Sequence, residues 1–203
     1  MDKKKNHPTM MGVGYFTDGK YELYDKSKKR TRTVVGDAWY SMLKRCYSKS
    51  TQSRYTTYIG CTVCEEWHSF QNFAKWYSEN IWNEEFTFLD KDILIKGNKL
   101  YSPNTCIIVD NNINNLFTKN NKNRGDLLIG VVKRGNKFAS RISICGNMKT
   151  IGNFYTQEEA FTSYKLAKES YIKQVADEYK SKYHNFPQKL YDAMYSYEVE
   201  IAD

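Results

Sequence analysis

The residues with the clearest chemistry lie in 126–156, where apolar and polar positions alternate. Over 137–144 this alternation places Arg141 on one side of a predicted strand, together with Ala139 and Ser143. The predicted hairpins beside that strand add four more basic residues: Lys133, Arg134, Lys137 and Lys149. Because arginine is well suited to a bidentate contact with guanine, this side predicts a surface that enters the major groove of DNA. In the alternative interpretation, the lysines only keep edge strands from aggregating.

A second group of residue types is typical of zinc sites. Cys61 and Cys64 have Cys-x-x-Cys spacing, and His68 and Cys106 would complete a set of four ligands. Tetrahedral zinc takes four such groups. Trp67 lies in the same segment, however, and a buried cysteine also behaves as a small hydrophobic residue. Core packing is therefore the preferred interpretation, and zinc is the alternative.

Three short strands must position the basic side chains. They are predicted over 127–132, 137–144 and 149–154, with turns at 134–136 and 146–147. Thr156 and Glu159 have the spacing of a capping box, which predicts that a helix begins there. The sequence therefore predicts a three-stranded antiparallel sheet packed on one helix, with the other face of the sheet open.

Residues 34–124 are predicted to form a separate mixed module. Its first helix carries an apolar face at Trp39, Met42, Leu43 and Cys46, with Asp37 as the expected N-cap. An aromatic stripe follows at helical spacing: Trp67, Phe70, Phe73, Trp76 and Tyr77. This spacing favours a packed core over a platform for base stacking. Two strands are expected at 86–89 and 106–109, then a helix, and the basic residues 119–125 are expected to form a linker.

Charge is unevenly distributed along the 203 residues, which carry 31 basic and 23 acidic side chains. Residues 157–203 hold nine acidic and six basic side chains, a net charge of −3, so residues 1–156 carry +11. A basic body favours a polyanionic partner, with nucleic acid as the first candidate, although solubility is an alternative explanation. No apolar run is long enough for a membrane helix, and no secretory signal is evident. Five cysteines without a regular framework favour the cytoplasm.

Four motifs stand together in residues 126–176. They are Ile129-Gly130-Val131, Phe138-Ala139-Ser140-Arg141-Ile142, Gly152-Asn153-Phe154-Tyr155-Thr156 and Glu158-Glu159-Ala160-Phe161-Thr162-Ser163-Tyr164. Together they resemble the APETALA-type DNA-binding domain of plant ethylene-response factors and phage homing endonucleases. The resemblance implies that the sheet reads double-stranded DNA through Lys133, Arg134, Lys137, Arg141, Ser143 and Lys149. Ala139 stands where many members of that family carry a basic residue.

The upstream part carries a second set of motifs. They are Trp39-x-x-Met42-x-x-Arg45-Cys46, Tyr58-x-Gly60, Trp67-x-x-Phe70, Leu89-Asp90-Lys91-Asp92 and Tyr101-Ser102-Pro103. These resemble phage proteins of the HNH endonuclease family. That family implies a ββα site with one divalent metal, here within residues 86–117. A histidine acts there as general base on water, while a carboxylate and a later histidine or asparagine hold the metal.

The chain departs from the HNH pattern at the general base. Lys91 occupies the histidine position, and a lysine is protonated at neutral pH. Asp90 and Asp92 remain as oxygen ligands suited to Mg²⁺, with Asn115 or Asn112 as the last ligand. The site is therefore expected to be a vestige, in which Lys91 and Lys99 contact phosphate. Arg124, in the linker, is a further expected DNA contact.

These observations predict an α+β protein, with a degenerate ββα-metal (HNH-like) module followed by the three-stranded sheet on one helix. The expected divisions are a basic arm at 1–33, the module at 34–124, the APETALA-type domain at 126–176 and an acidic helical region at 177–203. The first hypothesis is binding of double-stranded DNA. The alternatives are an active Mg²⁺-dependent endonuclease and a phage interaction protein that inhibits a host enzyme or defence system and so has a host protein partner. A homodimer is also considered.

Overall fold

The chain forms two compact units. The computed structural model describes residues 9–83, 87–118 and 125–201, and its units are Met1–Asn114 (unit 1) and Asn115–Asp203 (unit 2). Helices and strands are mixed in the chain as a whole, so the α+β class is confirmed. The division between the units comes before the linker predicted at 119–125.

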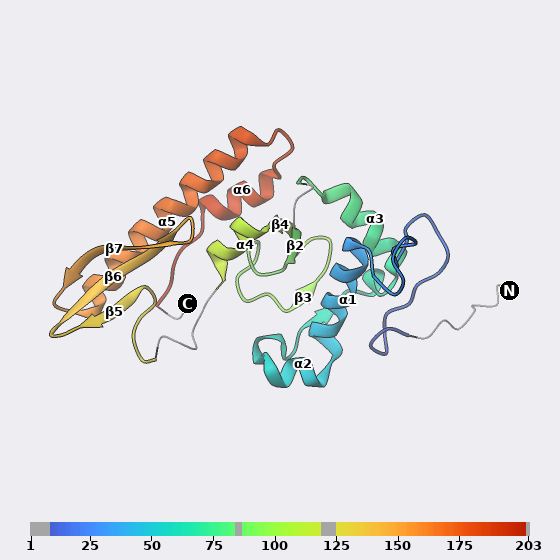
Figure 1. Ribbon diagram of the computed structural model, residues 1–203, viewed down its shortest axis with the longest axis horizontal. Coiled ribbons are helices and arrows are strands. Elements are labelled where there is room, and N and C mark those ends of the chain that lie inside the picture. Colours follow the sequence, from blue (N-terminus) through green and yellow to red (C-terminus); the bar gives the residue numbers. More distant parts are fainter. Residues whose placement is uncertain (1–8, 84–86, 119–124, 202–203) are drawn as a thin grey trace. The chain divides into compact units, whose positions relative to one another are not determined.

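Unit 1 combines helices with two small sheets (Figure 1). Its elements are α1 (Val34–Tyr47), α2 (Lys49–Arg54), η1 (Thr56–Tyr58), β1 (Thr62–Val63), η2 (Glu65–His68), α3 (Phe70–Asn80), β2 (Thr87–Asp90), β3 (Leu100–Tyr101) and β4 (Ile107–Asp110). Strand β1 pairs with β3 in parallel, and β2 pairs with β4 antiparallel. Helix α4 (Asn111–Phe117) follows β4 directly, and the Asp110 carboxylate accepts the Ile113 N–H at 2.9 Å.

Aromatic residues of α1, η2 and α3 build the core of unit 1. The predicted stripe supplies Trp67, Phe70 and Phe73, which are buried against Trp39. The Trp39 indole donates to the Trp67 carbonyl at 2.8 Å, so the burial leaves its N–H satisfied. The expected function of the stripe as core is confirmed.

Helix α1 begins one turn earlier than the sequence pattern predicts. The Thr33 hydroxyl accepts the Gly36 N–H at 3.1 Å, which makes Thr33 the N-cap and places Asp37 in the first turn. The prediction that Asp37 caps the helix is therefore wrong. Segment 9–33, expected as part of an arm, packs on this core: Leu23 is buried, and Tyr15 exchanges backbone hydrogen bonds with the residues around Ser69.

Unit 2 is an antiparallel sheet with a long helix lying along it (Figure 1). The sheet order is β5 (Val131–Arg134), β6 (Lys137–Ile144) and β7 (Asn147–Phe154). It is followed by α5 (Gln157–Lys182) and α6 (Gln188–Tyr195). Both the three-stranded sheet and the capping box of Thr156 and Glu159 are confirmed.

The first strand of the sheet starts later than predicted. Val131 donates to the Leu128 carbonyl in a turn, and Gly130 has φ +76°, which ends any extended run from residue 127. A Cβ at Gly130 would overlap the ring of Tyr164 on α5. The glycine therefore lets the chain pass closely over the helix before β5 begins.

Lys168 lies on the buried stripe of α5, one turn from Tyr164 and one turn from Ile172. Burial lowers the pKa of its ammonium to about 8 from an ordinary 10.5. The charged ammonium of Lys168 therefore lowers the free energy of unfolding at pH values below 8. This destabilisation disappears as the pH rises from 8 to 10.5. We expect Lys168→Met to raise the free energy of unfolding by about 1–3 kcal/mol at neutral pH and by much less above pH 10. Urea unfolding at both pH values measures this, and an equal gain at both would contradict it.

Candidate nucleic-acid interface

The strand register of unit 2 decides which basic side chains share a face. Phe138 and Ile142 of β6 pack in the core with α5, so the neighbouring positions of β6 point to the open face. Arg134 pairs with Lys137, and Arg141 pairs with Thr150 across β6 and β7. One open face therefore carries four predicted contact residues: Arg134, Lys137, Arg141 and Ser143.

The basic groups of this open face are not neutralised by acids. Arg134, Lys137 and Arg141 form no ion pair within the described residues. The Lys137 ammonium lies 4.7 Å from the centroid of the exposed Tyr155 ring. The Nε of Arg141 is buried without a hydrogen-bond partner in the described part of the chain. This buried donor is closed to an external acceptor, so what the face offers to a ligand is the charge of Arg134, Lys137 and Arg141.

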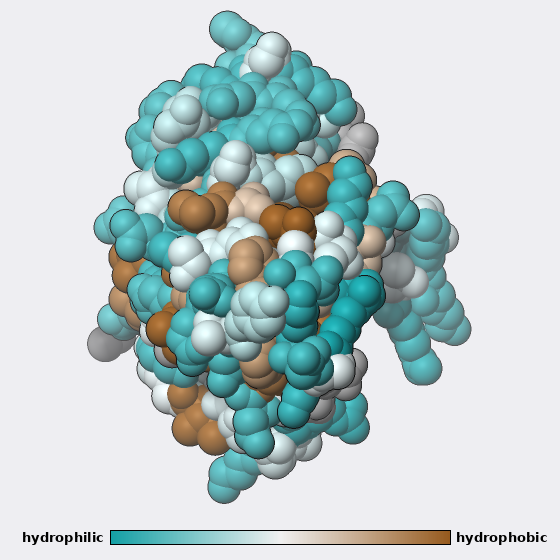
Figure 2. Space-filling model, turned by 90° about the vertical axis from the view of Figure 1, so that its left-hand side faces the viewer, coloured by the Kyte–Doolittle hydropathy of each residue, from teal (hydrophilic) through white to brown (hydrophobic). Residues whose placement is uncertain are grey.

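The surrounding surface is also polar and basic. Residues 126–156 contain five basic side chains and one acidic side chain. The side of the molecule that faces the viewer in Figure 2 is mostly hydrophilic, with small separate hydrophobic spots. Val132 and Met148 share the open face and are 38% and 56% exposed. Isolated apolar groups among cations suit contact with thymine methyl groups better than a dry protein interface.

The other predicted DNA contacts lie elsewhere. Lys133 pairs with Phe138, and Lys149 pairs with Ile142, so both start from the face that packs on α5, although both are exposed. The Lys99 ammonium donates to the Thr57 carbonyl at 2.7 Å in unit 1. Arg124 lies outside the described residues. The register therefore separates Lys133 and Lys149 from Arg141.

Strand β2 leads into a loop that engages the predicted metal ligands. The Asp90 Oδ1 accepts the N–H groups of Asp92 and Ile93, each at 2.7 Å. Lys91 is only 6% exposed, and its ammonium donates to both carboxylate oxygens of Asp92, at 2.7 and 2.8 Å. It also donates to the Asn98 carbonyl at 2.6 Å. Lys91 is thus a structural cation, and its ammonium is turned away from solvent.

These contacts do not fit a Mg²⁺ site. The Asp90 Oδ1 already accepts two backbone N–H groups, and the Asp92 oxygens already neutralise Lys91. In residues 9–83, 87–118 and 125–201, no three His, Cys, Asp or Glu side chains come close enough to hold a metal ion. Asn115 is exposed on α4. The order of two strands and a helix is present, but the carboxylates of Asp90 and Asp92 form hydrogen bonds and an ion pair within the loop after β2.

In the ion pair of Lys91 and Asp92, removing the carboxylate should destabilise the protein more than removing the amine. Asp92→Asn leaves a buried ammonium without its counter-charge, while Lys91→Met fills the same space with an apolar chain. Because Asp92 is half exposed, we expect a loss of about 1–2 kcal/mol for Asp92→Asn and a smaller loss for Lys91→Met. Thermal unfolding tests this. A rise in melting temperature of the unsubstituted protein with added Mg²⁺ would contradict the structural interpretation.

Other contacts engage the predicted zinc ligands Cys61, Cys64, His68 and Cys106. The Cys61 thiol donates to the Thr57 carbonyl at 3.8 Å, and the His68 Nε2 lies 3.4 Å from the Tyr47 hydroxyl. Among the described residues, no three His, Cys, Asp or Glu side chains lie close enough together to hold a metal ion, and this includes these four. The four side chains do not fit a zinc site.

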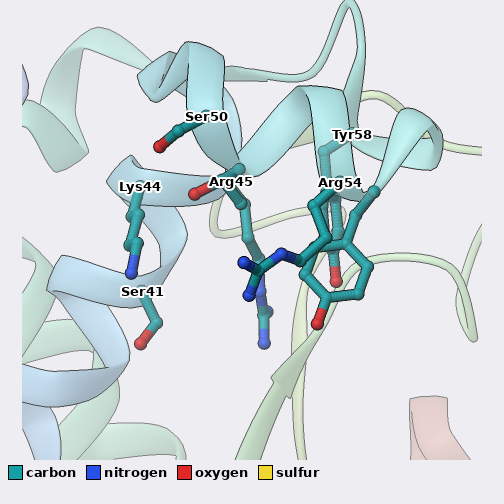
Figure 3. Close-up of a pocket in the computed structure, with 8 residues that line it drawn as sticks. Ser41, Lys44, Arg45, Ser50, Arg54 and Tyr58 are labelled. Carbon is teal, nitrogen blue, oxygen red and sulfur yellow. The ribbon is translucent and has the colours of Figure 1, made fainter.

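The structure reveals a polar groove that the sequence patterns did not single out (Figure 3). Its volume is about 580 Å³, and its lining is basic or hydroxyl-bearing: Ser41, Lys44, Arg45, Ser50, Thr51, Arg54, Tyr55 and Tyr58. Helix α1 supplies one wall, and α2 with η1 supplies the other. The sequence does contain an indication of this basic groove: residues 38–64 carry four basic side chains and no acidic one.

The chain matches no known protein-family model, no curated protein and no solved structure. Within the described residues, none of the helices has the length and apolar character needed to cross a bilayer. The functional assignment therefore rests on the residues and geometry described above.

Proposed function

We propose that the chain binds double-stranded DNA through the open face of the β5–β7 sheet. The observation that carries the proposal is the joint placement of Arg134, Lys137 and Arg141 on one face without acidic partners. A small antiparallel sheet fits the major groove, which is about 12 Å wide. Arg141 lies on the central strand, where it reaches base edges, and the hairpin residues Arg134 and Lys137 reach the flanking phosphates.

The proposal includes a relation to phage HNH homing endonucleases that carry an APETALA-type domain, with a degenerate metal site. The sheet and capped helix of unit 2 are the elements that this resemblance implies. Lys91 and Asp92 form an internal ion pair at the position of the catalytic residues, so the geometry favours binding over hydrolysis. Mg²⁺-dependent cleavage remains the alternative function.

Selection of bound duplexes from a random pool, run with Mg²⁺ and with a chelator, tests both functions at once. We expect the same enriched sequences in both conditions and no strand breaks. Affinity for the enriched duplex should fall steeply with salt, because cations that contact phosphate release counterions. Affinity that does not change between low and high salt would contradict the proposal. Cleavage that requires Mg²⁺ and is lost in Asp90→Ala would identify the nuclease.

A further inference from the structure

We propose that the groove between α1, α2 and η1 binds an unpaired nucleotide of a nucleic-acid strand. Its phosphate would lie against Lys44, Arg45 and Arg54, and its base against Tyr55. The groove belongs to unit 1, so this inference goes beyond duplex binding by the sheet of unit 2. Each proposal can therefore fail without the other.

The first argument for a phosphate ligand is positive charge that is not held in an ion pair. Figure 3 shows the ends of Lys44, Arg45 and Arg54 directed to the same side of the ribbon. None of the three forms an ion pair with any residue that the structure describes, and the lining contains no acidic side chain. Arginine and lysine in this arrangement attract a phosphate and can hold it with charge-assisted hydrogen bonds.

Arg45 gives the groove a fixed cation at its inner side. The guanidinium lies 5.5 Å from the centroid of the Tyr58 ring, which restricts its position. Burial would lower the pKa of Arg45, but interactions with Tyr101, Tyr58 and the Asp90 carboxylate raise it, so the side chain stays charged. A charge in a partly dry site interacts more strongly with a ligand than one in open water. Ser41 and Ser50 add hydroxyl groups that can donate to phosphate oxygens.

An exposed aromatic ring is the second argument, and it points to a nucleotide. Tyr55 is 51% exposed, and Tyr58 supports it edge to face at a centroid distance of 6.3 Å. A basic groove beside an open aromatic ring is typical of sites that bind unpaired nucleotides, because every base can stack on the ring. Bases inside a duplex are already stacked and cannot reach Tyr55. The volume of about 580 Å³ is also within the roughly 300–1,000 Å³ of small-ligand sites.

Fluorescence anisotropy with a short labelled oligothymidine tests the groove. We expect the Lys44→Gln/Arg54→Gln variant to bind it about tenfold more weakly than the unsubstituted protein. The matched control is Lys49→Gln/Lys75→Gln, which removes the same charge from exposed lysines that do not line the groove. The control should stay within about twofold of the unsubstituted protein. Equal losses in the two variants would overturn the proposal.

The base contact has its own test. Tyr55→Ala should weaken oligothymidine binding about tenfold and leave competition by an abasic phosphodiester chain unchanged. Oligouridine should bind like oligothymidine, since both offer phosphates and unpaired bases. The assignment to a nucleic-acid strand would be overturned if thymidine monophosphate bound more tightly than either oligomer. It would also be overturned if polyglutamate competed for the groove as strongly as the two oligomers. The Arg134→Gln/Arg141→Gln variant should retain oligothymidine binding, and this separates the groove from the sheet.

Discussion

We expect that replacing Arg134 and Arg141 together with glutamine will lower the affinity for duplex DNA by about 30- to 100-fold. In the proposed complex, Arg141 supplies a bidentate base contact worth about 1–3 kcal/mol, and Arg134 neutralises a phosphate. The slope of log affinity against log salt should become shallower by about 0.9 for each phosphate that the variant no longer neutralises. Fluorescence anisotropy over a salt series measures both quantities, and thermal unfolding confirms that the variant is folded.

The matched control for this prediction is Lys133→Gln/Lys149→Gln. It removes the same charge from the same sheet, but both lysines start from the face that carries Phe138 and Ile142. We expect this control to lose less than about threefold in affinity. If both double variants lose the same affinity, total charge rather than the open face decides binding, and the proposed interface is wrong.

Gly130→Ala is expected to destabilise the protein by about 2–5 kcal/mol. Two costs add at this position: a positive φ costs an L-residue about 1–2 kcal/mol, and the new methyl group overlaps the Tyr164 ring. Tyr164 is buried on α5, so it cannot turn away without opening the core of unit 2. Urea unfolding followed by circular dichroism measures the loss.

Gly135→Ala separates the two costs. Gly135 also has a positive φ, of +60°, but a Cβ there meets no atom within 4 Å. We therefore expect a loss of only about 1–2 kcal/mol, from backbone strain alone. If Gly135→Ala costs as much as Gly130→Ala, the contact with Tyr164 contributes nothing, and the close approach of the chain to α5 has no energetic role.

Sequence patterns that span only a few residues predicted several elements of the fold. The capping box of Thr156 and Glu159, the hairpin glycine Gly135 and the alternation in β6 each involve residues only a few positions apart. Hydrogen bonding and side-chain periodicity act over that same range, so these elements could be identified without tertiary information. The aromatic stripe at 67–77 was assigned to the core for the same reason.

The amino-acid sequence by itself determined the α+β class, the sheet with its capped helix and the excess of basic charge in residues 1–156. Only the tertiary structure decided which charges act together. Strand register set Lys133 apart from Arg141, loop closure buried Lys91 against Asp92, and the packing of α2 and η1 beside α1 created the groove. Spacing along the chain specifies the local direction of a side chain. Its neighbours across a strand, loop or helix depend on contacts between distant residues, and the energy of packing the whole unit selects those contacts.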